Sequence, residues 1–140
     1  MSTAHGIGRL DGRRTILCIE DDPARLALIE RALSRRATIQ LVTATDALAG
    51  TRMARQHVPD LVLLDLNVGG MGGEEVLARL HADPATRAVP VVVVGSGASA
   101  SLCQRLIARG AQSYLPMPFH AADLCRVVEY ALSAPSRAAA

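Results

Sequence analysis

The sequence predicts a doubly wound α/β fold, in which five parallel strands form one sheet and five helices cover it. Strand-like and helix-like segments alternate five times along the chain. Three of the strand-like segments, at about 15–19, 61–65 and 91–94, are largely continuous apolar runs. Such runs are typical of parallel strands that helices cover on both faces. Ligands of these folds bind beside the carboxyl ends of the strands, so we expect the functional residues at that edge.

The first half of the chain is predicted to form two strand–helix units. The first strand covers about 15–19 and the second about 39–43. In the helix after the first strand, Asp22 is the expected N-cap and Pro23 the first helical residue. The second helix is expected at about 46–56.

The second half of the chain repeats the pattern three times. Strands are expected at about 61–65, 91–94 and 113–115. Each strand is followed by a segment whose apolar side chains recur at helical spacing: Val76, Leu77 and Leu80, then Leu102, Leu106 and Ile107, then Leu124, Val127, Val128 and Leu132. A glycine-rich loop precedes the third helix, and Gly110 is the expected C-cap of the fourth.

One folded domain is predicted over residues 15–133. Residues 1–14 show no apolar period and are expected to be a flexible lead-in, and residues 134–140 are expected to be a tail or the start of a linker. A chain of 140 residues can bury roughly two-thirds of its unfolded surface. Half of the residues are hydrophobic but only 2% are aromatic, so we expect a core of Leu, Val, Ile and Ala.

The composition argues against binding to nucleic acid or to a membrane. The net charge is only +2, and no arginine stripe is interleaved with aromatic residues. The longest apolar run, at 89–94, is too short to span a membrane, and the N-terminus carries no hydrophobic signal segment. The three cysteines have no C-x-x-C spacing, as expected for core or half-buried residues of a reduced, cytoplasmic protein.

Acidic residues follow two of the predicted strands. Asp65 ends the third strand, and the first strand runs directly into Glu20, Asp21 and Asp22. Two such strands that lie side by side in a parallel sheet can build one acidic pocket. A pocket of this kind binds a hard divalent cation and leaves one carboxylate free to act as a nucleophile. Asp22 is better explained as a helix cap than as a ligand.

Five segments of the chain follow one another in a family-like order and spacing. They are residues 16–22 (ILCIEDD), 59–66 (PDLVLLDL), 71–73 (MGG), 90–94 (PVVVV) and 110–119 (GAQSYLPMPF). Together they resemble the receiver domain of two-component response regulators, and the resemblance covers nearly the whole predicted domain. It implies a flavodoxin-like sheet with the strand order 2-1-3-4-5 and a part in phosphorelay signalling.

The resemblance implies a role for each residue of the predicted pocket. Asp65 would be the phospho-acceptor, which attacks the phosphohistidine of a sensor kinase. Glu20, Asp21 and Asp65 would hold Mg²⁺ or Mn²⁺, with the backbone carbonyl group of Asn67 as a further ligand. Phosphoryl transfer depends mostly on positioning and on charge neutralisation, and the metal ion supplies positive charge.

Two departures make the chain atypical of this family. Met117 stands where a lysine usually precedes the proline, and Gly95 stands where the fourth strand usually ends in serine or threonine. Ser96, one place later, is a candidate for a displaced hydroxyl group. Tyr114 matches the aromatic switch position, and the bond before Pro118 matches one that is usually cis. Without the lysine and the hydroxyl group, the switch loses two of its usual contacts.

The chain contains no lysine at all, which has an electrostatic consequence. Three carboxylates that converge without a neighbouring lysine repel one another, and like charges at close range disfavour joint ionisation. The sequence therefore predicts that a divalent metal ion stabilises this fold.

Three functional hypotheses follow from these residues. The first is a phosphorylatable receiver, whose partners are a sensor histidine kinase or phosphotransfer protein and a protein bound at the fourth helix, fifth strand and fifth helix. The second is a degenerate receiver that binds proteins without phosphorylation; Met117 and Gly95 favour it, and the intact carboxylates oppose it. The third is an aspartate-nucleophile phosphatase, but that chemistry usually needs a lysine, so we do not expect an enzyme. We favour the first, either as a stand-alone receiver or as a piece of a hybrid kinase.

Overall fold

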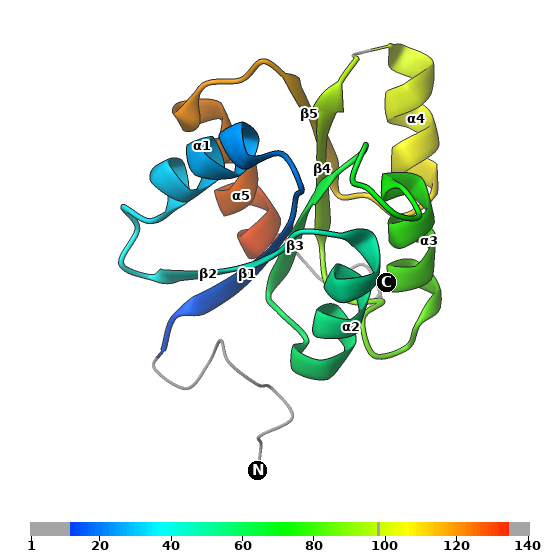
Figure 1. Ribbon diagram of the computed structural model, residues 1–140, viewed down its shortest axis with the longest axis horizontal. Coiled ribbons are helices and arrows are strands. Elements are labelled where there is room, and N and C mark those ends of the chain that lie inside the picture. The colour runs from blue at the N-terminus through cyan, green and yellow to red at the C-terminus, as the bar shows by residue number, and fades with distance from the viewer. Residues whose placement is uncertain (1–11, 98, 135–140) are drawn as a thin grey trace.

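Five parallel strands form the centre of the computed structural model, which describes residues 12–97 and 99–134 (Figure 1). They are β1 (Arg14–Ile19), β2 (Ile39–Ala44), β3 (Leu61–Asp65), β4 (Val91–Ser96) and β5 (Ser113–Met117). Their order across the sheet is β2-β1-β3-β4-β5, and every neighbouring pair is parallel. The doubly wound fold and its strand order are therefore confirmed, and β1 and β3 lie next to each other.

Five helices cover the two faces of the sheet (Figure 1). They are α1 (Pro23–Leu33), α2 (Ala47–His57), α3 (Gly73–Ala82), α4 (Ala100–Ala108) and α5 (Ala121–Ser133). Helices α1 and α5 pack side by side on one face, and α2 and α3 pack together on the other. Helix α4 lies on the same side as α3, against β5.

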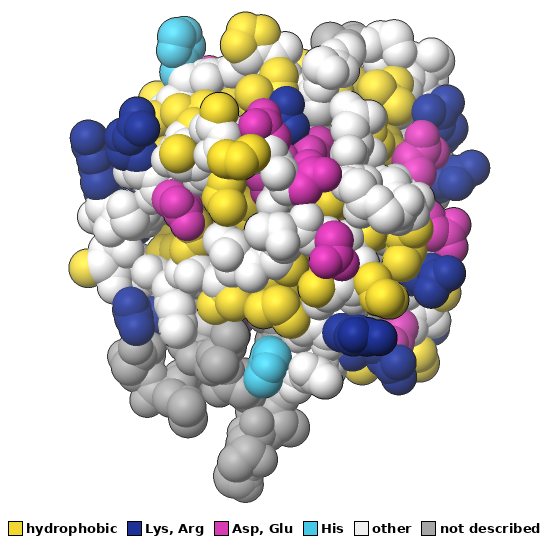
Figure 2. Space-filling model, viewed as in Figure 1, with side chains coloured by type: hydrophobic (Ala, Val, Ile, Leu, Met, Phe, Trp, Pro, Cys, Tyr) yellow, Lys and Arg dark blue, Asp and Glu magenta, His cyan; other side chains and the backbone are white. Residues whose placement is uncertain are grey.

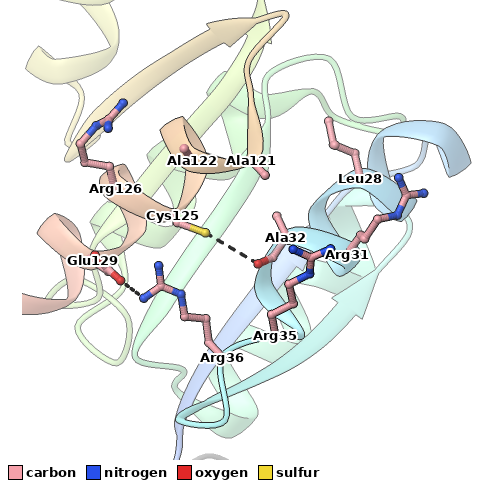
Figure 3. A pocket seen from close by; sticks show the side chains of 10 residues that line it. All are labelled: Leu28, Arg31, Ala32, Arg35, Arg36, Ala121, Ala122, Cys125, Arg126 and Glu129. Carbon is pink, nitrogen blue, oxygen red and sulfur yellow. Dashed lines mark hydrogen bonds and ion pairs between the residues drawn. The ribbon is translucent and has the colours of Figure 1, made fainter.

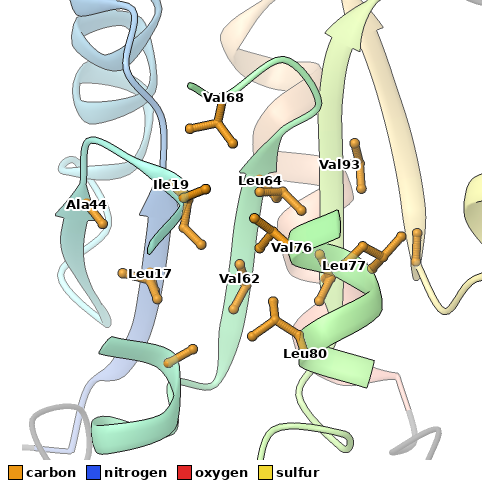
Figure 4. Close-up of a cluster of buried hydrophobic side chains, with 14 of the residues drawn as sticks. Leu17, Ile19, Ala44, Val62, Leu64, Val68, Val76, Leu77, Leu80 and Val93 are labelled. Carbon is orange, nitrogen blue, oxygen red and sulfur yellow. The ribbon is translucent and has the colours of Figure 1, made fainter. Parts of the chain in front are cut away.

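Alternate side chains of the strands enter two separate cores. Leu17, Ile19 and Leu64 point towards α2 and α3, as the close-up in Figure 4 shows. Cys18 and Leu63, which lie between them in the sequence, point towards α1 and α5. Burying each of the larger aliphatic side chains stabilises the fold by about 1.5–3 kcal/mol. The two cores consist largely of Leu, Val, Ile and Ala, as the composition predicts.

Of the two predicted caps, that of α1 is confirmed and that of α4 lies one residue away from its predicted position. Asp22 caps α1 by accepting a hydrogen bond of 3.2 Å from a backbone amide, and Pro23 is the first helical residue. Asp46 caps α2 in the same way, at 2.8 Å. In α4 the C-cap is Arg109, and Gly110 is the residue after it. Gly110 has a φ of 112°, a left-handed conformation that glycine adopts without the steric penalty of a Cβ.

Strands β4 and β5 each extend two residues beyond their predicted ends. Gly95 pairs with Pro116 and Ser96 pairs with Met117 in the parallel register. The apolar runs stop earlier, but the pairing continues because it joins main-chain groups and does not require apolar side chains. The extension places Gly95 and Met117, the two positions at which the chain departs from the implied family pattern, near the ends of neighbouring strands.

The predicted lead-in and tail fall almost entirely outside the described residues. Within them, Arg14 already belongs to β1, one residue before the predicted start of the domain. No helix in the described ranges has the length and apolar character that a membrane span requires.

Candidate functional site

Three carboxylates meet at the carboxyl ends of β1 and β3. Ile19 lies beside Leu64 in the parallel register, so the residues that follow them, Glu20 and Asp65, are brought together. Oxygen atoms of Glu20, Asp21 and Asp65 all lie within 4.8 Å of one another, and we call this group the acidic pocket. Glu20 and Asp65 are buried, whereas Asp21 is exposed. In Figure 2, acidic side chains gather in the upper middle of the view, the end towards which β1 and β3 run in Figure 1.

Backbone amides hold the carboxylates of the acidic pocket in place. Asn67 N–H donates to Asp65 Oδ1 at 2.9 Å, and Gly69 N–H donates to Asp21 Oδ2 at 2.9 Å. Glu20 Oε2 accepts from the amide two residues further on, at 3.1 Å. Asn67 and Gly69 both belong to the loop between β3 and α3, so the conformation of this loop and the positions of the carboxylates depend on each other. The role of the Asn67 carbonyl group as a ligand remains a prediction.

Arg25 places its guanidinium group against the acidic pocket, a contact that the sequence did not predict. Its Nη1 donates to Asp65 Oδ2 at 3.0 Å and to Glu20 Oε2 at 3.4 Å. Its Nη2 lies 3.8 Å from Asp22 Oδ2. Arg25 is the third residue of α1, and helical side chains tilt towards the helix N-terminus, which here adjoins the end of β1. An arginine in the first turn after an acidic run is the signal that could have revealed it.

The carboxyl group of Glu20 is electrostatically unusual. Burial, followed by the hydrogen bond and charge of the neighbouring Asp65 carboxylate, raises the pKa of Glu20 to about 8. The Asp22 amide and the positive charge of Arg25 act in the opposite direction but do not cancel the rise. In the absence of metal, Glu20 therefore holds a proton over a pH range in which an exposed glutamate is ionised.

This raised pKa predicts a pH-dependent stability for the metal-free protein. The pKa of Glu20 in the folded state lies above its value of 4.5 in the unfolded chain. The contribution of the Glu20 proton to the free energy of unfolding is therefore fully present below pH 4.5 and is lost as the pH rises through about 8. We expect the free energy of unfolding in urea with a chelator to fall over this range, by at most about 1.4 kcal/mol per pH unit. The slope should flatten in Glu20→Gln but remain in Glu30→Gln, which alters an exposed residue of α1. Equal slopes in the parent and Glu20→Gln would contradict the prediction.

The donor set of the acidic pocket fits a hard divalent cation. Glu20 Oε1 is buried and has no hydrogen-bond partner among the described residues. Buried polar atoms are normally paired, and a metal ion would satisfy this oxygen. Carboxylate oxygens are the ligands that Mg²⁺ and Mn²⁺ favour, and Glu20, Asp21 and Asp65 can each offer one.

Tyr114 lies over Gly95 at the end of β4. A Cβ atom on Gly95 would lie 3.2 Å from Tyr114 Oη and 3.0 Å from Leu66 Cβ, so a larger residue would require a neighbour to shift. The Tyr114 hydroxyl donates to the backbone carbonyl group of Gly97 and, at 3.5 Å, to that of Ser96. Burial raises the pKa of this hydroxyl. Main-chain groups therefore hold the ring, and the switch roles of Tyr114 and Ser96 remain predictions.

Met117 acts as a packing residue. Its half-buried side chain lies against the core between the sheet and helices α1 and α5. The peptide bond between Met117 and Pro118 is cis, as the resemblance implied. The position at which the resemblance implies a lysine therefore contributes apolar contact and no charge.

A hollow of about 570 Å³ lies between α1 and α5, apart from the acidic pocket (Figure 3). Four arginines contribute to its lining: Arg31, Arg35, Arg36 and Arg126. Arg36 forms an ion pair with Glu129, and the Cys125 thiol donates to the backbone carbonyl group of Ala32 at 3.7 Å. None of the residues predicted for the site lines this hollow, so we place the functional site at the strand ends.

Comparison with known proteins identifies relatives of this chain. The family model for the response regulator receiver domain matches residues 16–129. The chain is 35% identical over 121 residues to the probable methanogenesis regulatory protein FilR2 of Methanothrix harundinacea, and the match covers 81% of this chain and 78% of FilR2. It is 30% identical over 114 residues to hybrid signal transduction histidine kinase D of Dictyostelium discoideum. That match covers 81% of this chain but only 7% of the kinase, so this chain spans a small part of that relative's length.

Solved structures share the same fold. One of them is the receiver domain of the sensor histidine kinase PA1611 from Pseudomonas aeruginosa, with a magnesium ion in its active-site cleft. It superposes with a TM-score of 0.79 at 23% sequence identity, and the match covers 87% of this chain and 99% of that domain.

Proposed function

The chain belongs to the family of response regulator receiver domains, and we propose that it accepts a phosphoryl group on Asp65 from a sensor histidine kinase or a phosphotransfer protein. The observation that carries this proposal is the convergence of Glu20, Asp21 and Asp65 at the carboxyl ends of β1 and β3. Receiver domains are signalling modules of two-component phosphorelays. The similarity to a hybrid histidine kinase supports a kinase as the partner.

The proposed reaction transfers a phosphoryl group between two nucleophiles. An oxygen of Asp65 attacks phosphorus, an O–P bond forms, and the P–N bond to the phosphohistidine breaks with its electron pair remaining on the imidazole nitrogen. Asp65 is buried at the end of β3, and the Asn67 amide fixes one of its oxygens. This restriction supports attack in a defined direction, since positioning supplies much of the catalysis in phosphoryl transfer.

We place Mg²⁺ or Mn²⁺ in the acidic pocket, held by Glu20, Asp21, Asp65 and the carbonyl group of Asn67. When bound, the ion supplies positive charge that offsets the negative charge of the transferring group. The magnesium ion in the PA1611 receiver domain supports this assignment, together with the unpartnered buried oxygen of Glu20.

The proposed output surface consists of α4, β5 and α5. Two large hydrophobic side chains are exposed there, Ile107 on α4 at 39% and Tyr130 on α5 at 64%. Tyr114 on β5 connects this surface to the end of β4 through its contacts with Gly95 and the Ser96 carbonyl group. Phosphorylation of Asp65 would bias the conformation of this surface and so change its affinity for a protein partner.

A second candidate is a degenerate receiver that binds its partner without phosphorylation. Two observations favour it, the packing role of Met117 and the absence of a side chain on Gly95 beneath Tyr114. Met117 and Gly95 each lack a side-chain group through which the family's switch usually works.

Incubation with acetyl phosphate and Mg²⁺, followed by intact mass measurement, separates the two candidates. A gain of one phosphoryl group supports the receiver that works by phosphorylation, because acetyl phosphate delivers the same group with acetate as the leaving group. An unchanged mass in a protein that binds Mg²⁺, measured by calorimetry, supports the degenerate receiver and contradicts the first proposal.

A further inference from the structure

Arg25 is the only basic residue in the described ranges that forms an ion pair with the carboxylates of the acidic pocket. Its Nη1 lies 3.0 Å from Asp65 Oδ2, the oxygen of the proposed phospho-acceptor that is not held by a backbone amide. Only 20% of the Arg25 side chain is exposed, so its contacts with the carboxylates are partly shielded from water. An ion pair in this setting is stronger than one on the open surface.

The guanidinium group of Arg25 has unused hydrogen-bond donors. It carries five N–H groups, and its hydrogen bonds to Asp65 and Glu20 both start from Nη1. Its Nε is buried and has no hydrogen-bond partner among the residues that the structure describes. Its Nη2 lies 3.8 Å from Asp22, which is too long for a hydrogen bond. A planar group with donors to spare, next to a nucleophilic oxygen, is suited to a phosphoryl group, whose oxygens accept paired N–H groups.

A phosphoryl group on Asp65 adds negative charge to a pocket that already contains three carboxylates. Strand β5 offers no compensating cation, because Met117 is uncharged and lies against the core. We propose that Arg25 binds the oxygens of the phosphoryl group on Asp65, so that α1 provides the positive charge that β5 lacks. This proposal rests on the proposed function and assigns a further residue to the same site.

The position of Arg25 also has a consequence for metal binding before phosphorylation. The guanidinium group already pairs with the carboxylates of Asp65 and Glu20, the same two side chains that would hold a divalent cation. Arg25 therefore lowers the affinity of the unphosphorylated acidic pocket for metal, through competition for ligands and through like-charge repulsion. Metal affinity gives a readout of the contact that does not depend on phosphoryl transfer.

The test compares Arg25→Met, Arg25→Lys and the parent chain, with Arg31→Met as the control. Met keeps much of the apolar stem and removes the charge, whereas Lys keeps the charge. Arg31 is an exposed residue of the same helix outside the acidic pocket. Calorimetric titration measures the Kd for Mg²⁺, and intact mass over time measures the rate of phosphorylation by acetyl phosphate at saturating Mg²⁺. Urea unfolding establishes that each variant is folded.

For Arg25→Met we expect Mg²⁺ to bind roughly tenfold more tightly. Phosphorylation at saturating Mg²⁺ should be at least about tenfold slower, because the loss of one charge-assisted contact typically causes a change of about this size. Arg25→Lys should retain most of the rate, and Arg31→Met should match the parent in both measurements. Tighter metal binding with slower transfer is a combination that mere structural damage does not produce.

An unchanged rate in Arg25→Met would overturn the proposal while leaving the proposed function intact, because the parent would still be phosphorylated. If the parent itself gained no phosphoryl group, the proposed function would fail and the assignment of Arg25 would fail with it. Whether the parent chain gains a phosphoryl group therefore distinguishes failure of the proposed function from failure of the Arg25 assignment.

Discussion

The Asp65→Asn variant is expected to gain no phosphoryl group from acetyl phosphate and Mg²⁺, under conditions in which the parent gains one. The amide oxygen of asparagine is a poor nucleophile, and removing the attacking group of a covalent mechanism typically lowers the rate by a factor on the order of 10³ or more. Asparagine is close in size to aspartate and still offers an oxygen to the Asn67 amide, so the substitution leaves the packing at the end of β3 largely unchanged. Intact mass measured over time gives the rate for each chain.

Asp46→Asn is the matched control for this experiment. Asp46 also follows a strand, β2, but it caps α2 and lies outside the acidic pocket. Asparagine caps helices as well as aspartate does, so this variant should remain folded and be phosphorylated at the parental rate. Phosphorylation of Asp65→Asn at the parental rate would place the acceptor on another residue.

Magnesium is expected to stabilise the parent chain strongly. A ligand that binds only the folded state at a hundred times its Kd adds about 2.7 kcal/mol to the free energy of unfolding. At roughly 4 °C per kcal/mol for a domain of this length, the Tm should rise by about 10 °C. The physical reason is that Glu20, Asp21 and Asp65 each offer an oxygen to the ion, and the buried Glu20 Oε1 has no hydrogen-bond partner among the described residues without it. Thermal unfolding with Mg²⁺ or with a chelator measures the difference.

Asp21→Asn separates metal binding from general effects of the salt. Asp21 is exposed, and its contact with the Gly69 amide needs only an oxygen acceptor, which asparagine retains. The metal-free Tm should therefore stay close to that of the parent, while most of the rise with Mg²⁺ disappears. A parent Tm that does not respond to Mg²⁺ or Mn²⁺ would count against a metal site in the acidic pocket.

The sequence predicted the fold and the meeting of the carboxylates because both depend on local patterns. Continuous apolar runs identified the buried parallel strands, and the acids stood directly after two of them. Once β1 and β3 are neighbours, their register determines that Glu20 and Asp65 lie together. The strand ends at Ser96 and Met117 were placed two residues too early, because main-chain pairing continues after the apolar pattern stops.

Arg25 could not be predicted with the same ease. Arginine is the only strongly basic residue type in this chain, so one more arginine in a helix carries little information. Its contact with Asp65 joins residues forty positions apart, and it depends on how α1 leaves the end of β1. The absence of lysine was visible in the sequence, and Arg25 in the first turn after the acidic run was a signal of a substitute, but the contact with Asp65 is established by the three-dimensional structure.

The placement of Tyr114 gives this protein an optical property. The chain has no tryptophan and two tyrosines, and the second, Tyr130, is an exposed residue of α5. A Tyr130→Phe variant would therefore draw its ultraviolet emission from a single ring, whose hydroxyl donates to carbonyl groups at the end of β4 and lies over Gly95. Emission from a phenol depends on the hydrogen bond that its hydroxyl makes. In that variant Tyr114 is an unlabelled reporter, whose emission should change when its contacts at the end of β4 change.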